Sequence, residues 1–195
     1  LVDRLPEPGG ILQQCIHNGF GLHKFKKDFT GPEYADYYIK KINQTSIDVL
    51  LRTMAMEITK DSKVILSNDI DGLIEVSAKA IILAMGCRER TRQQVSIPGT
   101  RPSGIFTAGV AQRFVNIEGF MPGRNVVVVG SGDIGMIMAR RMTLEGAKVH
   151  AVTEILPYPG GLTRNVVQCL NDFNIPLYIR HNVINIYGKD RVERI

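Results

Sequence analysis

One sequence pattern occurs twice in this chain of 195 residues. The first copy covers residues 3–11 and the second covers residues 154–162, and each holds an acid, a leucine two residues later, two prolines and a double glycine. After each copy, a polar stretch leads to a short apolar run that ends in an arginine, Arg52 or Arg180. A second apolar run and a Lys-Asp turn follow in the same order. Because order and chemistry agree, we expect two related units in one chain.

A glycine-rich motif stands before the second copy: Gly130-Ser131-Gly132-Asp133-Ile134-Gly135. It follows four consecutive valines, which predict a buried parallel strand over 125–129, and it opens a stretch that predicts a helix through Leu144. The first glycine permits a tight turn, the second lets the main chain approach a pyrophosphate, and the third lets the helix pack on the strand. The helix N-terminus would then face an anion, so the segment predicts a dinucleotide-binding turn.

The helix after this motif is expected to bury one face. Ile134, Met138 and Met142 recur every four residues and are predicted to face the sheet. Gly146 suits a left-handed helix end. Asp133 is expected to favour the helix N-terminus through the helix dipole, with its side chain pointing away from a ligand.

Glu154 follows a strand expected over residues 148–153 and lies 19 residues after the last glycine of the motif. Carboxylates at about this spacing accept hydrogen bonds from the adenosine ribose of a dinucleotide. The acid favours NAD over NADP, because a 2′-phosphate at 4 Å would meet repulsion of roughly 1 to 4 kcal/mol. No arginine follows within a few residues to offset that repulsion, since the nearest downstream is Arg164.

Asp3 occupies the position of Glu154 in the first copy, so it is expected to end a similar unit. No glycine-rich loop precedes it, and the chain begins at Leu1 in what reads as the middle of a strand. We therefore expect a fragment with two incomplete units. The expected fold class is α/β, with two Rossmann-like, three-layer dinucleotide-binding units and a β-meander.

Composition excludes several classes of protein. The net charge is +5, and basic residues cluster at 24–27 and at 88–92. We do not expect aromatic side chains that could stack on bases to be interleaved with these clusters. Phosphorylated cofactors, rather than nucleic acid, are therefore the anions that we expect the chain to bind. No apolar run approaches the about 20 residues of a membrane span. The three cysteines are widely spaced and the histidines lack ligand spacing, which predicts neither a disulfide framework nor a metal site and favours a reducing cytoplasm.

Residues 79–88 form an apolar run, expected as a strand, that enters a glycine turn at Ala84-Met85-Gly86, and Ile97-Pro98-Gly99 follows. The first segment resembles the second flavin-contacting strand of the pyridine nucleotide-disulphide oxidoreductase superfamily, in which the turn usually reads Ala-Thr-Gly. The second resembles the Ile-Pro-Gly segment that precedes the NAD domain of that superfamily. Residues 9–19 are similar to the flavin part of bacterial FAD/NAD-dependent dehydrogenases. The resemblance covers essentially the whole chain and implies a partial FAD-binding domain over 1–107 and a partial NAD-binding domain over 108–195.

The resemblance implies a flavin-dependent oxidoreductase, a dehydrogenase that passes hydride between NAD(H) and FAD. The residues that it implies for FAD are Asp3, Gly9, Gly10, Gln13, Gln14, Met54, Ala55, Ala84, Met85 and Gly86. Those that it implies for NAD are Gly130, Ser131, Gly132, Asp133, Ile134, Gly135 and Glu154. A partner oxidoreductase subunit is a further expectation.

Two departures from the family pattern argue against disulfide reduction. The redox-active Cys-x4-Cys pair is missing, and Ile137 stands where many of these reductases carry a glutamate. Cys15, with His17 nearby, is the one candidate for a catalytic residue, which would require a depressed thiol pKa. Burial of this thiol for packing is the alternative interpretation.

Two other functions stay open beside the dehydrogenase. One is a non-catalytic module that binds NAD, and the other is a subunit that passes electrons to a partner. A single-domain NAD dehydrogenase is disfavoured, because no Tyr-x-x-x-Lys pair follows the glycine loop.

Overall fold

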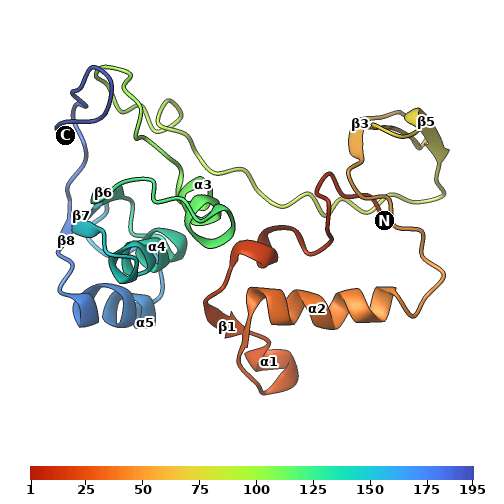
Figure 1. Ribbon diagram of the computed structural model, residues 1–195, viewed down its shortest axis with the longest axis horizontal. Helices are drawn as coiled ribbons and strands as arrows, with labels where there is room; N and C mark the ends of the chain where they lie inside the picture. The colour runs from red at the N-terminus through yellow and green to blue at the C-terminus, as the bar shows by residue number, and fades with distance from the viewer. The chain divides into compact units, whose positions relative to one another are not determined.

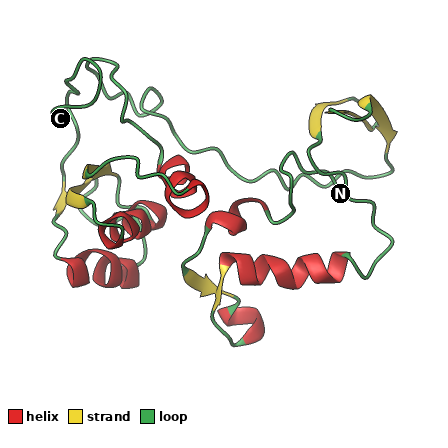
Figure 2. Ribbon diagram, viewed as in Figure 1, coloured by secondary structure: helices red, strands yellow, loops and turns green.

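The computed structural model describes residues 1–195, and the contacts within it divide the chain into two compact units. The first unit is Leu1–Cys87 and the second is Arg88–Ile195 (Figure 1). The division thus falls at residue 87, whereas the sequence places a boundary at 107. Both units contain helices and strands (Figure 2), which confirms the α/β class. None of the helices is long and apolar enough to cross a membrane.

A three-stranded parallel sheet organises the second unit. Its strands and the first connecting helix are β6 (Asn125–Val129), α4 (Asp133–Leu144), β7 (Lys148–Glu154) and β8 (Leu177–Ile179). Strand β7 lies between β6 and β8 and pairs with both in parallel. This order is that of one half of a Rossmann fold. The predicted strand over 125–129 and helix through Leu144 are confirmed, and β7 ends one residue beyond the predicted 148–153.

Helix α4 buries a face that is centred on Ala139. The buried residues of this face are Met136, Met138, Ala139 and Met142. They pack in one hydrophobic cluster with Val152 of β7. The sequence predicts Ile134 on the same face, but its side chain is 39% exposed, because at 3.6 residues per turn it lies outside the arc that these residues define. Gly146 follows the helix with a φ of +87°, which confirms the left-handed end.

Short helical turns complete the core around α4. Between β7 and β8 they are α5 (Thr163–Asn165), a π-helical turn (Val166–Leu170) and a 3-10 turn (Asn171–Phe173). Before the sheet, α3 (Ala108–Arg113) continues into a second π-helical turn (Phe114–Glu118). Leu170 is fully buried and Ala111 of α3 is also buried, and both belong to the cluster that α4 forms. The crossover from β7 to β8 is therefore held by packing rather than by one long helix.

Residues 98–103 run parallel to residues 186–192 within the second unit, through bridges at Gly99 and Ser103. The N–H of Ile186 donates to the carbonyl oxygen of Pro98 at 3.1 Å. Gly99 has a φ of +114°, and a Cβ there would collide with the main chain of Ile186. Only glycine allows this close approach.

The first unit holds two antiparallel sheets. Its elements are a 3-10 turn (Gly10–Gln14), β1 (Asn18–Phe20), α1 (Leu22–Phe25), β2 (Phe29–Thr30), α2 (Gly31–Ile42), β3 (Met54–Ile58), β4 (Lys63–Asn68) and β5 (Gly72–Ser77). Strand β1 pairs with β2, and β3, β4 and β5 form the predicted meander. The second unit has no matching meander, because Tyr187 and Arg194 form only an isolated bridge.

Helix α2 begins at a capping box, in which the Thr30 hydroxyl accepts from the N–H of Glu33. The aromatic rings that pack around this helix are those of Phe25, Phe29, Tyr34, Tyr37 and Tyr38. Lys24 donates to the Tyr38 hydroxyl at 2.6 Å, and Lys27 lies over the Phe29 ring. The basic cluster at 24–27 is therefore interleaved with aromatics, contrary to expectation. The rings pack against one another, which leaves them poorly placed to stack on nucleic-acid bases.

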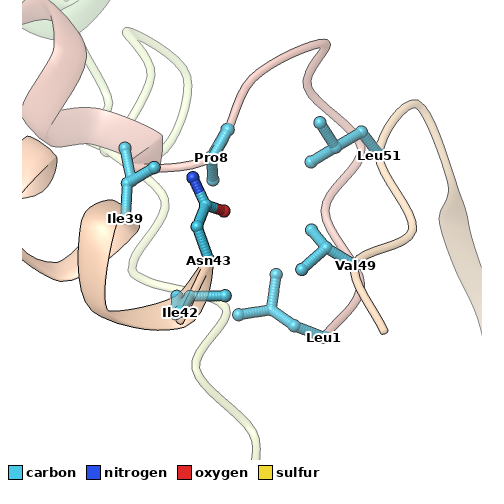
Figure 3. Close-up of a pocket in the computed structure, with 7 residues that line it drawn as sticks. All are labelled: Leu1, Pro8, Ile39, Ile42, Asn43, Val49 and Leu51. Carbon is cyan, nitrogen blue, oxygen red and sulfur yellow. The ribbon is translucent and has the colours of Figure 1, made fainter. Parts of the chain in front are cut away.

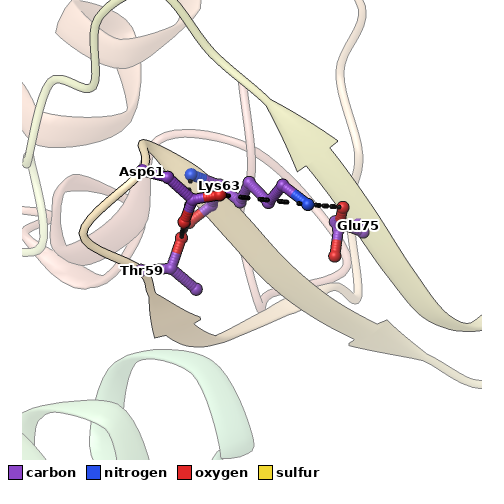
Figure 4. Close-up of polar contacts among 4 residues, drawn as sticks. All are labelled: Thr59, Asp61, Lys63 and Glu75. Atoms are coloured by element: carbon purple, nitrogen blue, oxygen red, sulfur yellow. Dashed lines mark hydrogen bonds and ion pairs between the residues drawn. The ribbon is translucent and has the colours of Figure 1, made fainter.

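Lys63 of β4 connects the neighbouring strand and turn of the meander (Figure 4). Its Nζ lies 2.7 Å from Glu75 Oε1 on β5 and 3.9 Å from Asp61 Oδ2 in the turn after β3. Thr59 donates to the same Asp61 side chain at 2.6 Å. All these groups are exposed enough that the ion pairs contribute about 1 kcal/mol or less.

A pocket of about 250 Å³ lies beside the C-terminal end of α2 in the first unit (Figure 3). Its lining residues are Leu1, Pro8, Ile39, Ile42, Asn43, Val49 and Leu51. Apolar side chains point into it, and Asn43 supplies the one polar side chain of the lining. A dinucleotide needs several polar groups to fix its orientation, so this pocket does not suit one.

The strand expected over residues 79–88 is not formed. Residues 78–90 have no regular structure, and Ile82 and Met85 are 92% and 82% exposed. An apolar segment becomes a strand only where a neighbour supplies main-chain partners, and no strand of the first unit pairs with this run. Gly86 does adopt a positive φ of +70°, as a glycine turn requires.

Candidate functional site

The candidate site lies at the carboxyl ends of β6 and β7, where the glycine-rich motif turns into α4. Gly130 has a φ of +99°, and its N–H donates to the Thr153 carbonyl at 2.8 Å. A Cβ on Gly135 would lie 2.8 Å from the Gly130 carbonyl oxygen, so a side chain there would push the helix off the turn. A Cβ on Gly132 would meet open space. The turn is tight and closely packed and offers an open main chain at Gly132, which are the features that a pyrophosphate-binding loop needs.

Glu154 ends β7 beside this turn and is only 7% exposed. Its Oε2 accepts from both the N–H and the hydroxyl of Ser131, at 3.0 and 2.6 Å. Its Oε1 accepts from the N–H of Leu156 at 2.9 Å. Burial alone would raise the pKa of this carboxyl group, but the hydrogen bonds from Ser131 and Leu156 outweigh burial and lower its pKa below the ordinary 4.5. The carboxylate is therefore held in place and kept ionised by protein donors.

The double-glycine loop of the second copy packs on the same turn. The N–H of Gly160 donates to the Ser131 hydroxyl at 2.8 Å. The Asp133 carboxylate accepts from the N–H of Leu162 and from the side chain of Asn165, each at 2.7 Å. The sequence predicts that Asp133 acts on the helix dipole; it also ties the start of α4 to the segment after β7.

The first unit repeats the surroundings of the acid. Asp3 Oδ1 accepts from the N–H of Leu5 at 2.9 Å, two residues on, as Glu154 accepts from Leu156. The N–H of Thr53 donates to the Asp3 carbonyl at 3.0 Å. The N–H of His181 likewise donates to the Glu154 carbonyl at 2.9 Å. The sequence repeat is therefore also a repeat of main-chain hydrogen bonds.

Equivalent arginines close this pattern in both units. The N–H of Arg52 donates to the Leu5 carbonyl at 3.0 Å, and that of Arg180 donates to the Leu156 carbonyl at 3.1 Å. Both arginines have a positive φ, +50° and +56°. Sequence reasoning places these arginines only as the ends of two apolar runs and misses their place beside the acids. Their shared place at the end of the first apolar run after the double glycine in each copy is the signal that could have found them.

The other residues expected at FAD lie in three segments of the first unit. Gly9 and Gly10 have positive φ, and Gln13 donates to the Pro8 carbonyl at 2.8 Å, which places Gln13 and Gln14 on the turn after the double glycine. Met54 and Ala55 begin β3, directly after Thr53 and so close to Asp3. The remaining three, Ala84, Met85 and Gly86, lie in the exposed irregular segment.

Cys15 is buried, at 5% exposure, against the start of α2. Its carbonyl accepts from the N–H of Gly31 at 2.8 Å, and a Cβ on Gly31 would collide with Cys15. His17 does not extend toward solvent, since its Nδ1 lies 2.9 Å from the Asn18 carbonyl and its Nε2 is buried. This setting is typical of a packed thiol. The structure brings together no group of three metal-ligating side chains.

A family model agrees with this geometry. The model described as pyridine nucleotide-disulphide oxidoreductase matches residues 8–195. Members of the family use FAD and NAD(P)H, and FAD and NAD are the cofactors expected from the sequence.

Similar proteins cover the chain but are much longer. An opine oxidase subunit of Agrobacterium tumefaciens (strain Ach5) is 23% identical over 206 residues, which cover 96% of this chain and 40% of that protein. Hydrogen cyanide synthase subunit HcnB of Pseudomonas protegens is 26% identical over 160 residues, 79% of this chain and 32% of that protein. The thioredoxin reductase structure of T. acidophilum superposes with a TM-score of 0.67 at 19% identity, over 98% of this chain and 59% of that one. The chain therefore spans less than half the length of the curated relatives it matches.

Proposed function

Because the chain belongs to the pyridine nucleotide-disulphide oxidoreductase family, we propose that its protein is a flavin-dependent dehydrogenase that passes hydride between NAD(H) and FAD. We assign NAD to the second unit and FAD to the first. The flavin and nicotinamide rings supply the redox chemistry when bound. The polypeptide binds, orients and shields them.

The observation that carries this proposal is the arrangement around β6, α4 and β7. A tight glycine turn leads into a helix N-terminus, and an ionised carboxylate stands at the end of the adjacent parallel strand. That combination suits a dinucleotide, whose pyrophosphate sits at the helix N-terminus and whose ribose hydroxyls donate to the acid. Gly130, Gly132 and Gly135 with Glu154 would hold NAD, and Ser131, Asp133 and Ile134 line the same turn.

For FAD, the repeated surroundings of Asp3 support the same mode of adenosine binding in the first unit. Gly9, Gly10, Gln13 and Gln14 would lie on the approach to the flavin. Met54 and Ala55, which follow Thr53, would lie near the adenine. The irregular segment with Ala84, Met85 and Gly86 would contact the flavin through its main chain.

The partner that we propose is a second oxidoreductase subunit. Two relatives are named as subunits, one of opine oxidase and one of hydrogen cyanide synthase. Electron transfer to a partner is then the second candidate function of this chain. We place the protein in a reducing cytoplasm because no disulfide joins any of Cys15, Cys87 and Cys169.

Disulfide reduction is not proposed. That reaction needs two closely spaced thiols in the flavin part, and the first unit offers only Cys15, which is buried, and Cys87, which lies in the irregular segment. Cys15 keeps a packing role in this proposal.

The test is the visible absorption spectrum of the protein before and after anaerobic addition of NADH. A flavin spectrum that bleaches with NADH supports the dehydrogenase. A protein that stays colourless after reconstitution with FAD, yet binds NADH, would instead support the NAD-binding module. A flavin that NADH does not reduce, but that a partner protein reduces, would support electron transfer alone.

A further inference from the structure

Helices α1 and α2 of the first unit carry exposed lysines that lie on aromatic rings. Lys24 of α1 donates to the Tyr38 hydroxyl at 2.6 Å, and the hydroxyls of Tyr38 and Tyr34 are 3.3 Å apart. The Nζ of Lys24 lies 4.7 Å from the centre of the Tyr38 ring, and that of Lys41 lies 4.8 Å from the centre of the Tyr37 ring. These five residues form what we call the lysine–tyrosine surface.

The charges of the two lysines are not neutralised within the chain. Neither Lys24 nor Lys41 forms an ion pair with a carboxylate. The carboxylates of the same stretch already have partners; they are Asp28, Glu33 and Asp36. The hydrogen bond to Tyr38 raises the pKa of Lys24 above its ordinary 10.5, so its ammonium group stays charged. Half of the lysines and arginines of the first unit fall within residues 24–41, so its positive charge gathers here.

The tyrosines of this surface are fixed by packing. The Tyr37 ring meets the Phe25 ring edge to face at 4.6 Å between centres, and it meets the Tyr38 ring in the same way at 5.2 Å. Rings that are already ordered lose little freedom when a partner binds. Tyrosine is also enriched among the residues that dominate protein interfaces. Such a surface suits a protein partner better than a membrane, whose binding uses apolar rings that are free to enter the lipid.

The surface lies close to the turn that follows the first double glycine. Ala35 of α2 is buried, and a Cβ on Gly9 would lie 3.1 Å from the Ala35 Cβ. The preceding residue, Tyr34, lies 6.2 Å from the Phe20 ring, and Phe20 lies 5.3 Å from the His17 ring. Because one helix contacts both the turn and the rings, about 10 to 12 Å, the diameter of a helix, separates them.

We propose that the lysine–tyrosine surface is the docking site of the second oxidoreductase subunit, which binds it through a face rich in Asp and Glu. The inference rests on the proposed function, because that subunit and the place of the flavin belong to it. Interfaces between redox partners are small and are steered by opposite charge, which suits two unpaired ammonium groups beside ordered rings. A subunit bound there would lie beside the turn on the approach to the flavin.

The experiment uses a fluorescein-labelled oligo-glutamate peptide of about ten residues in place of the acidic face. Its Kd for the protein is measured by fluorescence anisotropy. Lys24→Gln and Lys41→Gln should each raise this Kd by about two- to fivefold, the range for an exposed ion pair, and the double variant by about 4- to 25-fold.

The matched control is Lys60→Gln in the turn after β3. Lys60 is exposed in the same unit, and the substitution changes the net charge by the same amount. It should change the Kd by less than about 1.5-fold, because contact with the peptide, and not net charge, is expected to set the affinity.

Three results would overturn the docking site. One is equal weakening by Lys60→Gln and Lys24→Gln, which would mean that the peptide responds to net charge alone. Another is peptide binding that neither Lys24→Gln nor Lys41→Gln weakens. The third is a protein that binds phosphatidylglycerol vesicles through the two lysines but does not bind the peptide, which would make the surface a membrane contact. None of these results bears on the proposed function, whose failure would appear instead as the absence of a flavin that NADH reduces.

Discussion

Ser131 donates two hydrogen bonds to one oxygen of Glu154, through its N–H at 3.0 Å and its hydroxyl at 2.6 Å. Ser131 is completely buried and Glu154 is nearly so. The same hydroxyl accepts from the N–H of Gly160. One small side chain thus joins the glycine turn, the end of β7 and the double-glycine loop.

Ser131→Ala should destabilise the second unit. The change removes a donor to a buried carboxylate and the acceptor of a main-chain N–H, and a buried group left without its partner costs about 1 to 3 kcal/mol. Urea unfolding of both proteins measures the difference. Ser77→Ala on the exposed edge of β5 is the control, with a change within about 0.5 kcal/mol. Equal small changes in both variants would show that the network does not hold the loop.

The lowered pKa of Glu154 predicts an acid-sensitive contribution to stability. A carboxyl group whose pKa is lower in the folded state stabilises the fold above its ordinary pKa of 4.5, and that contribution is lost as the pH falls through the lowered pKa. Glu154→Gln should therefore be less stable than wild type at pH 7, and the gap should shrink below about pH 4. The free energy of unfolding as a function of pH tests this. A gap that is constant from about pH 7 to about pH 3 would contradict it.

The two glycines of the second copy should respond differently to a methyl group. A Cβ on Gly161 would lie 2.5 Å from Asp133 Oδ1 and 2.6 Å from Met136 Cε. A Cβ on Gly160 would have its nearest neighbour at 3.6 Å, an ordinary contact. Gly161→Ala should cost about 1 to 3 kcal/mol, the range for overpacking, and Gly160→Ala less than about 0.5 kcal/mol. Thermal unfolding of the two variants measures the difference in stability between them. Similar losses of stability would mean that the loop does not pack on α4 as described.

The buried face of α4 can be tested in the same way. Met136 is fully buried, whereas Ile134, two residues earlier, is 39% exposed. Met136→Ala should cost about 2 to 5 kcal/mol through lost contacts and a cavity. Ile134→Ala should lower the free energy of unfolding much less. If Ile134→Ala instead cost more than Met136→Ala, the buried face would be the one expected from the sequence.

Local patterns in the sequence are sufficient for part of the fold. Four valines, the glycine motif and Gly146 predict β6, α4 and the helix end at the observed residues, because each depends on neighbours in sequence. The position of Ile134 is not predicted correctly, since which arc of a helix is buried depends on what packs against it. The run at 79–88 has strand composition but no pairing neighbour in its unit.

The site shows the same limit. The motif and the spacing of Glu154 locate the turn and the acid, and the repeat locates Asp3. The bonds from Ser131 and the approach of Arg180 come from side-chain direction and from strand pairing between distant residues. No pattern within one window of sequence contains that information.

The parallel pairing of residues 98–103 with residues 186–192 has a consequence for how the protein is made. Thr100 donates to the carbonyl of Gly188, which lies 88 positions later. As the chain leaves the ribosome, the earlier segment must wait without its partner while the sheet of β6, β7 and β8 is synthesised. Contacts that close such long loops form late and slowly. The pairing of residues 98–103 with residues 186–192 should therefore be the last step in the folding of the second unit, after the glycine turn has formed.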